Sequence, residues 1–469
     1  MRFAILILLC AQSAFSASRY IRAGAAGANN GTSWTDAWTT FGGAGTETRG
    51  DTYYVAGGTY TETVIIGAAL SGTAYITIKK ANATDNSGDA GWSSAYESAQ
   101  VKIVGTVDLN FGYIRFDGVT GSETNGHGIL ITNTALTTCL TLEAGGSGYQ
   151  VIGTEIRGTN MTTQTSFDGI NWNNTGATQK GLLVERCWIH EVSRNGVTLG
   201  GIVGTSFSDY GALFRSNVVM RTGDVQNGDH GQSFQVCYAT EGRFLRWEQN
   251  KIYNVLGSAM IAMLAGAGSI HHDYRIVNNV FFNTDNVTFN VISPGVVWSH
   301  ADAIACSNVF IANNTFYNIG SAANPGSQAQ VVLETVGATN NSLVNNLWES
   351  CNLTAKNFGF ATNRNNGFYL NTGTGATAST GSTNGQVIGV SSALTSPSAG
   401  DYSLVASSYA VDSGFDISDT VTADYAGAAW SVPFDLGAYE FQSGASPTTY
   451  RGFQFGSGVK LIGPGRLTQ

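Results

Sequence analysis

Ionisable side chains gather in three successive polar segments of the chain, although only 12% of all residues are charged. The first segment lies between Arg157 and Asp168, the second is HEVSRNG at 190–196, and the third is MRTGDVQNGDHG at 220–231. The segment YNVLGSA, which follows in the same relative position, carries no charge. Acids and bases concentrated in this way are typical of catalytic sites. We therefore predict catalytic roles for Asp168, Glu191, Arg194, Arg221, Asp229 and His230.

These residue types favour proton transfer, because carboxylates beside a histidine can act as general acids and bases. Cation binding is a weaker alternative. Asp224 and Asp229 in DVQNGD offer the oxygen ligands that Ca²⁺ prefers, but their spacing does not match an EF-hand loop. Ca²⁺ is the one cofactor for which we find candidate ligands.

Other polar and aromatic residues could contact a ligand near these segments. A structural interpretation competes with this one, because Asp or Asn before glycine often caps a turn and a tryptophan often fills a core. Charged neighbours such as Glu191 and Arg194 could likewise form a surface ion pair of little energetic value. We predict binding roles for Asn195, Trp172, His300 and Asp302.

A repeat of about thirty residues must position these groups. Its units place an Asn, or once a Cys, among alternating apolar residues rich in Val, Ile, Phe and Tyr. This pattern predicts strands stacked as a β solenoid, with the asparagine amides hydrogen-bonded along its axis. The second strand of many units begins with a polar residue before Gly or Ala, as in His127-Gly128 and Asp168-Gly169, and we expect these residues to form one column. The central residues are Cys187, Asn217, Asn250, Asn279, Asn314 and Asn346, with weaker copies at Asp117 and Thr154.

The domain organisation follows from composition along the chain. Residues 1–17 have the charged start, apolar run and small residues of a signal peptide, which predicts an exported protein. Residues 18–62 should cap the solenoid and hold a short helix near Trp34 and Trp38. We expect the solenoid over 63–442, with a flexible loop near 371–385, and a Gly-rich basic tail over 443–469.

Charge and cysteine content exclude several classes of protein. The net charge is −9 without any Lys/Arg run, which argues against a nucleic-acid partner. After the signal peptide, no stretch is long and apolar enough to predict a membrane span. Five cysteines remain and none has CxxC spacing, so we expect buried free thiols.

The chain resembles secreted right-handed parallel β-helix proteins of the pectin-lyase-like group over about residues 18–442. The resemblance lies in the opening NNGTSW…RGDTYYVAGGTY, the closing SSYAVDSGFD…DLGAYEF and the xNNxFxN coils. It implies an all-β parallel β-helix of about eight or more coils, with an extracellular polysaccharide bound on the face formed by the second strands. It implies no particular reaction, because the group includes lyases, hydrolases, tailspikes and adhesins.

Two reactions on a glycan fit the charged segments. In hydrolysis, Asp168 and Asp229, two coils apart, would flank the bond, with His230 assisting. In β-elimination, His230 or Arg194 would remove a proton, and Arg221 or a cation would neutralise a uronate carboxylate. The alternative is a non-catalytic fibre, adhesin or tailspike-like protein, in which the tail mediates self-association by adding a strand to a neighbour.

Overall fold

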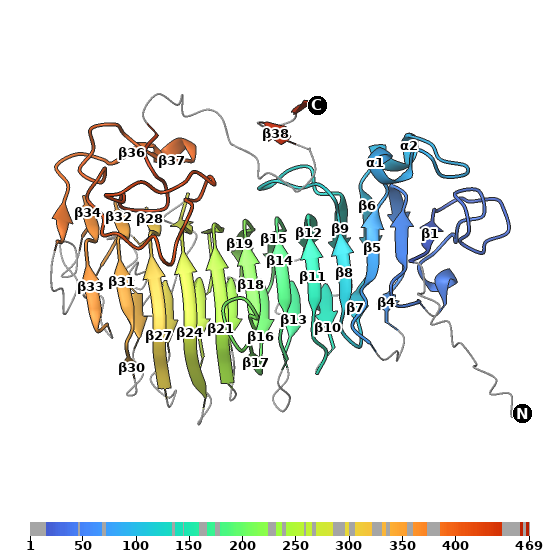
Figure 1. Ribbon diagram of the computed structural model, residues 1–469, viewed down its shortest axis with the longest axis horizontal. Coiled ribbons are helices and arrows are strands. Elements are labelled where there is room, and N and C mark those ends of the chain that lie inside the picture. The colour runs from blue at the N-terminus through green and yellow to red at the C-terminus, as the bar shows by residue number, and fades with distance from the viewer. Residues whose placement is uncertain are drawn as a thin grey trace, which may run out of the picture.

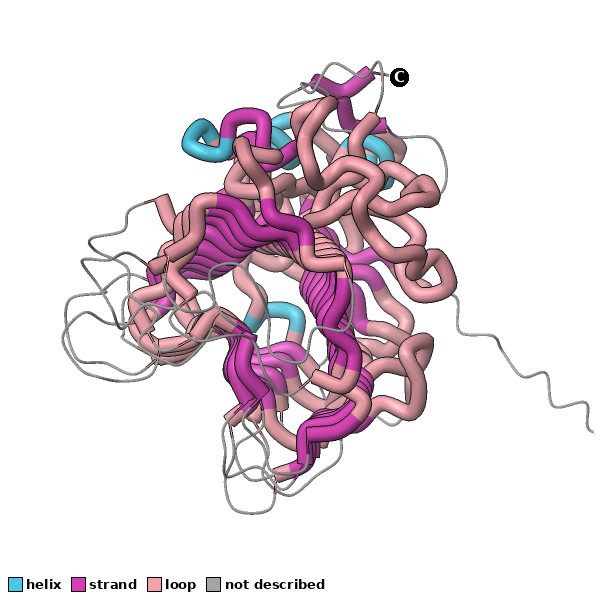
Figure 2. Tube along the Cα trace, turned by 90° about the vertical axis from the view of Figure 1, so that its left-hand side faces the viewer, coloured by secondary structure: helices cyan, strands magenta, loops and turns pink. Residues whose placement is uncertain are grey.

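The chain folds into a right-handed parallel β-helix, as the computed structural model shows (Figures 1 and 2). Viewed along the coil axis, the strands stack in ladders around a closed cross-section. The structure describes residues 16–45, 47–67, 72–133, 137–143, 145–158, 167–173, 179–223, 231–236, 241–257, 259–264, 269–284, 296–299, 305–320, 331–333, 338–353, 360–372, 385–442, 460–462 and 466–468.

Three long parallel sheets form the walls of the solenoid, and each successive coil adds a strand to them. The 14-stranded sheet contains β1 (Ser18–Ile21), β2 (Thr52–Val55), β5 (Ile76–Lys80), β8 (Ile114–Asp117), β11 (Tyr149–Ile152), β14 (Leu182–Glu185), β18 (Ala212–Arg215), β21 (Glu241–Glu248), β24 (Ile270–Val277), β27 (Ala305–Ala312), β31 (Ser342–Val344) and β33 (Thr362–Arg364), with β17 (Ile202–Val203) beside β21 and β30 (Ala338–Thr339) beside β27.

The other two long sheets follow the same order along the axis. The 12-stranded sheet contains β3 (Gly58–Tyr60), β6 (Val101–Val104), β9 (Ile129–Thr132), β12 (Thr154–Arg157), β15 (Trp188–Val192), β19 (Val218–Thr222), β22 (Lys251–Tyr253), β25 (Val280–Phe282), β28 (Thr315–Tyr317), β32 (Leu347–Glu349), β34 (Gly367–Tyr369) and β35 (Val387–Ile388). The nine-stranded sheet contains β4 (Val64–Ile66), β7 (Val107–Leu109), β10 (Leu140–Leu142), β13 (Ile170–Trp172), β16 (Val197–Leu199), β20 (Phe234–Val236), β23 (Ile261–Met263), β26 (Val297–Ser299) and β29 (Val331–Leu333).

The remaining elements are short. Two helices, α1 (Ala83–Asn86) and α2 (Ala95–Ser98), lie between β5 and β6, and 3₁₀ turns occupy Gly42–Ala44 and Pro397–Ala399. Two antiparallel pairs join β36 (Leu394–Ser396) to β37 (Asp401–Leu404) and β38 (Lys460–Ile462) to β39 (Arg466–Thr468). Within the described residues, no helix is long and apolar enough to cross a membrane.

The expected asparagine column forms a buried hydrogen-bonded ladder at the corner between the 14- and 12-stranded sheets. Asn250 Nδ2 donates to Asn279 Oδ1 at 2.9 Å, and Asn279 Nδ2 donates to Asn314 Oδ1 at 3.0 Å. The same contact continues through Asn346 to Asn366. The residue before most ladder positions has a positive φ, for example Asn278 at 56°, which asparagine tolerates better than most residues. The repeat therefore encodes a tight corner as well as a polar ladder.

The interior is apolar, with aromatic rings stacked from coil to coil. The rings of Phe281, Phe316, Trp348 and Phe368 form a stacked column. Neighbouring rings are nearly parallel, and their centroids lie 4.7–5.3 Å apart. Cys139, Cys187, Cys306 and Cys351 are buried free thiols, as predicted. The fifth cysteine, Cys237, lies outside the described residues.

The C-terminal segment, residues 393–441, folds back over the outer face of the 12-stranded sheet (Figure 1). Tyr402 packs against Phe282 at a centroid distance of 4.9 Å. Corner side chains also bind the backbone of this segment, since Asn345 Nδ2 donates to Phe415 O at 2.8 Å. The helices α1 and α2 lie on the same side near the other end of the solenoid.

Two expectations about the N-terminal coils are wrong. No helix forms around Trp34 and Trp38; Trp34 is fully buried against Trp92 and Tyr96, and the helices occur in the later insertion between β5 and β6. His127 also does not share a column with Asp168. His127 precedes β9 of the 12-stranded sheet, whereas Asp168 precedes β13 of the nine-stranded sheet, because a loop of eleven residues separates β8 from β9.

Candidate functional site

The outer face of the 12-stranded sheet carries a row of acid–base side chains in the middle of the solenoid. Side chains alternate between the two faces of a strand, so in β12 and β15 the apolar Ile156 and Ile189 enter the core. Their neighbours Glu155, Arg157 and His190 project from the opposite face, where Arg157 is in register with His190. Strand pleating thus brings together residues more than thirty positions apart.

Glu155 is the centre of this row. Its Oε1 lies 3.2 Å from His190 Nε2 and 3.9 Å from Arg157, and its Oε2 accepts a hydrogen bond of 3.2 Å from Gln100 Nε2. Burial raises the pKa of Glu155, but the hydrogen bonds and the nearby positive charges outweigh burial and place the pKa below its usual value. The carboxylate is therefore held in its charged form. The His190 ring stacks on the Trp188 ring at 3.8 Å, which fixes its orientation.

Glu191 and Arg221 extend the row toward the C-terminal ends of β15 and β19. Both have positive φ angles, 55° and 50°, and the parallel pairing of the two strands skips them and resumes at Val192 and Thr222. Their side chains are partly exposed and lie 3.5 Å apart, and Glu191 is also 3.8 Å from His190. The structure therefore brings together two residues that the sequence predicted to be neighbours.

Asp168, Arg194 and Asn195 also meet, but they meet inside a turn. Asp168 is 1% exposed; its Oδ2 accepts from Asn171 Nδ2 at 2.7 Å and its Oδ1 from the Asn195 backbone N–H at 3.2 Å. Burial raises the pKa of Asp168 despite Arg194 at 3.9 Å. Asn195 repeats the motif by accepting from Gln232 N at 2.9 Å. Asp168 and Asn195 therefore cap successive coils in this structure and offer no free group to a ligand.

The binding role predicted for Trp172 is wrong for this structure. Its indole is fully buried in the core, packs edge-on against Tyr149 and donates to Glu143 O at 3.3 Å. Trp172 faces inward because it shares its face of β13 with Ile170. Five predicted residues lie outside the described part of the chain: Asp224, Asp229, His230, His300 and Asp302. Among the described residues, no group of three or more His, Cys, Asp or Glu is arranged to hold a metal ion.

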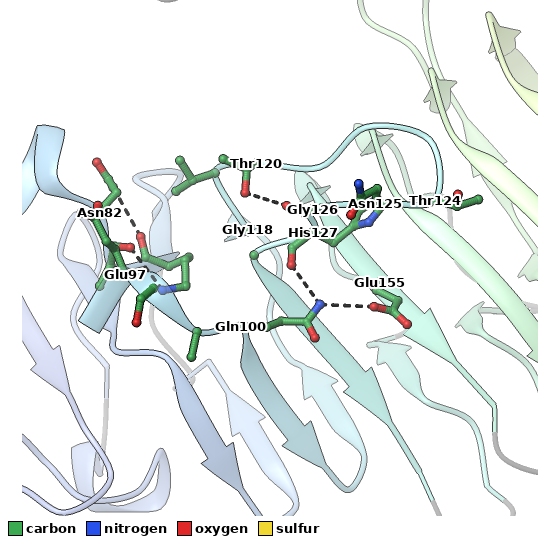
Figure 3. Close-up of a pocket in the computed structure, with 16 residues that line it drawn as sticks. Asn82, Glu97, Gln100, Gly118, Thr120, Thr124, Asn125, Gly126, His127 and Glu155 are labelled. Atoms are coloured by element: carbon green, nitrogen blue, oxygen red, sulfur yellow. Dashed lines mark hydrogen bonds between the residues drawn. The ribbon is translucent and has the colours of Figure 1, made fainter. Parts of the chain in front are cut away.

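A cavity of about 490 Å³ adjoins Glu155 at the N-terminal end of the row (Figure 3). Glu97 lies on one side of it, His127 and Glu155 lie on the other, and Gln100 lies between them. The segment 81–100, with α1 and α2, forms one wall, and the loop 118–128 forms the other. Lys80, at the end of β5, completes the lining.

Burial sets the charge state of two lining residues. Burial lowers the pKa of Lys80 to about 8, against the opposing effect of Glu97, and its Nζ donates to Tyr96 O at 2.8 Å. Burial likewise lowers the pKa of His127 to about 4, so this imidazole is neutral near pH 7. The cavity therefore combines two carboxylates, one largely protonated amine and a neutral histidine.

Sequence reasoning missed Lys80, Gln100 and Glu155. The sequence did indicate this site through an interruption of the repeat. Residues 81–100 separate the strands ITIKK and VKIV, whereas the corresponding strands of later coils are joined by a tight corner.

The strand topology defines the chain as a right-handed parallel β-helix with acid–base groups on one outer sheet face. No protein-family model matches the chain, and a search of curated proteins gives no match. Among solved structures it is similar to pectate lyase Pel9A, at 13% identity and a TM-score of 0.45, over 91% of this chain and 98% of that chain. It is also similar to the catalytic unit of the thermostable GH87 α-1,3-glucanase from Streptomyces thermodiastaticus strain HF3-3, at 14% identity and a TM-score of 0.33, over 72% and 62%.

Proposed function

We propose that the chain is a carbohydrate-active protein that cleaves an extracellular polysaccharide on the outer face of the 12-stranded sheet. The observation that carries this proposal is the Glu155–His190 contact of 3.2 Å, set among Arg157, Glu191 and Arg221. A charged carboxylate oriented by a histidine is suited to accept a proton from water or from a sugar carbon. Export fits a polymer substrate and rests on the predicted signal peptide at residues 1–17.

Hydrolysis and β-elimination make different demands on these residues. Hydrolysis needs a second carboxylate across the bond, and Glu191, Glu97 or the predicted Asp229 are the candidates. Elimination needs a positive group that neutralises a uronate, and Arg157 and Arg221 would supply it. Asp229 and His230 follow β19 in the sequence but lie outside the described residues, so their catalytic roles stay predictions.

A panel of neutral and acidic polysaccharides tests the proposal. Products would be followed by reducing ends, by absorbance of the unsaturated-uronate band, and with or without a chelator to test the predicted Ca²⁺. We expect at least one polymer to be cleaved, and Glu155→Gln to reduce that cleavage at least about a hundredfold. Full activity of this variant would refute the proposed site.

A non-catalytic fibre, adhesin or tailspike-like role is the second candidate. The observation in its favour is that Glu191 and Arg221 already pair with each other on the surface. In this role the basic tail would mediate self-association; of this tail the structure describes only the β38–β39 hairpin. Binding of a polysaccharide without any product would favour this candidate. An unchanged solution mass after deletion of residues 446–469 would remove the assembly role.

A further inference from the structure

The cavity between the α1–α2 segment and the loop 118–128 shares a residue with the proposed catalytic row. Glu155 lines the cavity, and its Oε2 accepts a hydrogen bond from Gln100 there, while its Oε1 contacts His190 on the open sheet face. One carboxylate thus connects an enclosed space to an open row. A polymer lying along the row would reach the cavity with one of its units.

We propose that this cavity is a binding subsite for a neutral sugar unit of the polysaccharide. The proposal rests on the proposed function and specifies its substrate class, which the acid–base row leaves open. Its volume of about 490 Å³ lies within the range of small-molecule binding pockets, roughly 300–1,000 Å³.

The chemistry of the lining matches hydroxyl groups. Hydroxyl and carboxamide side chains each offer both donor and acceptor atoms, as the hydroxyls of a sugar do. The lining contains no Phe, Tyr, Trp, Leu, Ile or Met side chain, and its apolar side chains are those of Ala81, Ala99 and Val119. The hydroxyl and carboxamide residues are Asn82, Ser98, Gln100, Thr120, Thr124 and Asn125.

Gln100 is held in a defined orientation across the cavity floor. Its Nε2 donates to His127 O at 2.9 Å and to Glu155 Oε2 at 3.2 Å. Both amide hydrogens are engaged, which leaves the carbonyl oxygen of Gln100 as the acceptor for a ligand hydroxyl. This arrangement orients an acceptor before any ligand binds.

The charges of the lining disfavour an acidic sugar. Glu97 and Glu155 contribute two negative charges and Lys80 contributes one positive charge, while His127 is neutral near pH 7. The sum is one negative charge. The Lys80 ammonium already donates to the carbonyls of Tyr96 and Ala81, at 2.8 and 3.4 Å. A uronate would therefore meet two carboxylates and a single ammonium that already donates two hydrogen bonds, which is unfavourable in a partly enclosed space.

Two substitutions within one helix test the subsite. Ser98 and Ala95 are both exposed residues of α2, but only Ser98 lines the cavity. Ser98→Trp should fill the space, and Ala95→Trp is the matched control. Isothermal titration calorimetry with neutral gluco-, xylo-, manno- and galacto-oligosaccharides, and with oligogalacturonates, gives the affinities of the intact protein and both variants.

We expect a neutral oligosaccharide to bind more tightly than any oligogalacturonate, with its affinity lowered at least tenfold by Ser98→Trp and unchanged by Ala95→Trp. Tighter binding of oligogalacturonates, or neutral binding that Ser98→Trp leaves unchanged, would overturn the subsite while leaving a polysaccharide function standing. A protein that neither binds nor cleaves any glycan would overturn the proposed function itself, and the subsite with it.

Discussion

Glu123 forms an ion pair with Lys251, a residue 128 positions further along the chain. Glu123 lies in the loop 118–128, and Lys251 begins β22, four strands away from β9 in the 12-stranded sheet. The Lys251 ammonium also lies 5.6 Å from the ring centroid of Tyr425 in the C-terminal segment. One lysine therefore links the loop that walls the cavity to the segment that covers the far end of the sheet.

Glu123→Gln should loosen this loop without unfolding the protein. A partly buried ion pair contributes about 1 kcal/mol, so amide hydrogen exchange in 118–128 should accelerate roughly fivefold. Lys180→Gln breaks the well-exposed pair with Asp209 and is the control. If residues 118–128 exchange at the same rate in both variants, the Glu123–Lys251 pair does not stabilise this loop.

Glu155→Gln should reduce cleavage about 10²- to 10⁴-fold, the usual contribution of a general base. Because its hydrogen bonds and charged neighbours place the pKa of Glu155 below 4.5, the charged form persists at pH values where an exposed glutamate is protonated. Activity should therefore be lost only as pH falls through that lower folded value. The stability contribution of Glu155 is likewise present above its unfolded pKa and lost as pH falls through the folded one.

Glu185→Gln is the control for this prediction, because Glu185 pairs with Arg215 on the outer face of the 14-stranded sheet. It should leave the rate and its pH profile unchanged. An acid limb of the rate profile above pH 4.5 would contradict the role of Glu155.

The C-terminal segment should dock more weakly as pH rises. Burial raises the pKa values of Asp424 and Asp435 to about 6, and the nearby charge of Glu440 contributes to this rise for Asp435. Because the pKa values of Asp424 and Asp435 are higher in the folded protein than the 3.8 of the unfolded chain, both residues stabilise the docked segment at low pH. This contribution is complete below pH 3.8 and is lost as the pH rises through about 6. Hydrogen exchange of residues 412–441 should therefore accelerate between about pH 4 and pH 6, after correction for intrinsic rates.

Glu440→Gln tests the electrostatic origin of this effect. The substitution removes a negative charge that interacts with Asp424 and Asp435, so the pH dependence of exchange should become shallower. A dependence as steep as that of the unaltered protein would assign the effect to other groups.

Asn279→Ala should destabilise the solenoid by about 2–4 kcal/mol, because it leaves several buried backbone groups without partners. Asn279 Nδ2 donates to Trp247 O at 2.9 Å, and its Oδ1 accepts from Asn250 N at 2.9 Å. Chemical denaturation measures the loss. The exposed Asn173→Ala should change the free energy of unfolding by less than about 0.5 kcal/mol. Similar losses in both variants would argue against the ladder as a source of stability.

The amino-acid sequence by itself determined the solenoid, its parallel strands and the asparagine ladder. These features repeat with each coil, so Asn250, Asn279 and Asn314 occupy equivalent positions that can be aligned without coordinates. The neighbourhood of Glu191 and Arg221 could be predicted for the same reason, because they occupy equivalent positions, one residue before the end, in the corresponding strands β15 and β19 of consecutive coils.

Only the tertiary structure decided which polar groups face a ligand. Trp172 is buried because its side of the strand faces the core, and Asp168 is buried because it lies inside a turn. A short stretch of sequence does not reveal either orientation. Glu155, Gln100 and Lys80 meet because a non-repeating insertion and a long loop fold over the sheet, and such contacts follow no period. Periodic contacts are encoded locally in each coil, whereas the cavity depends on contacts between segments whose spacing in the sequence is irregular.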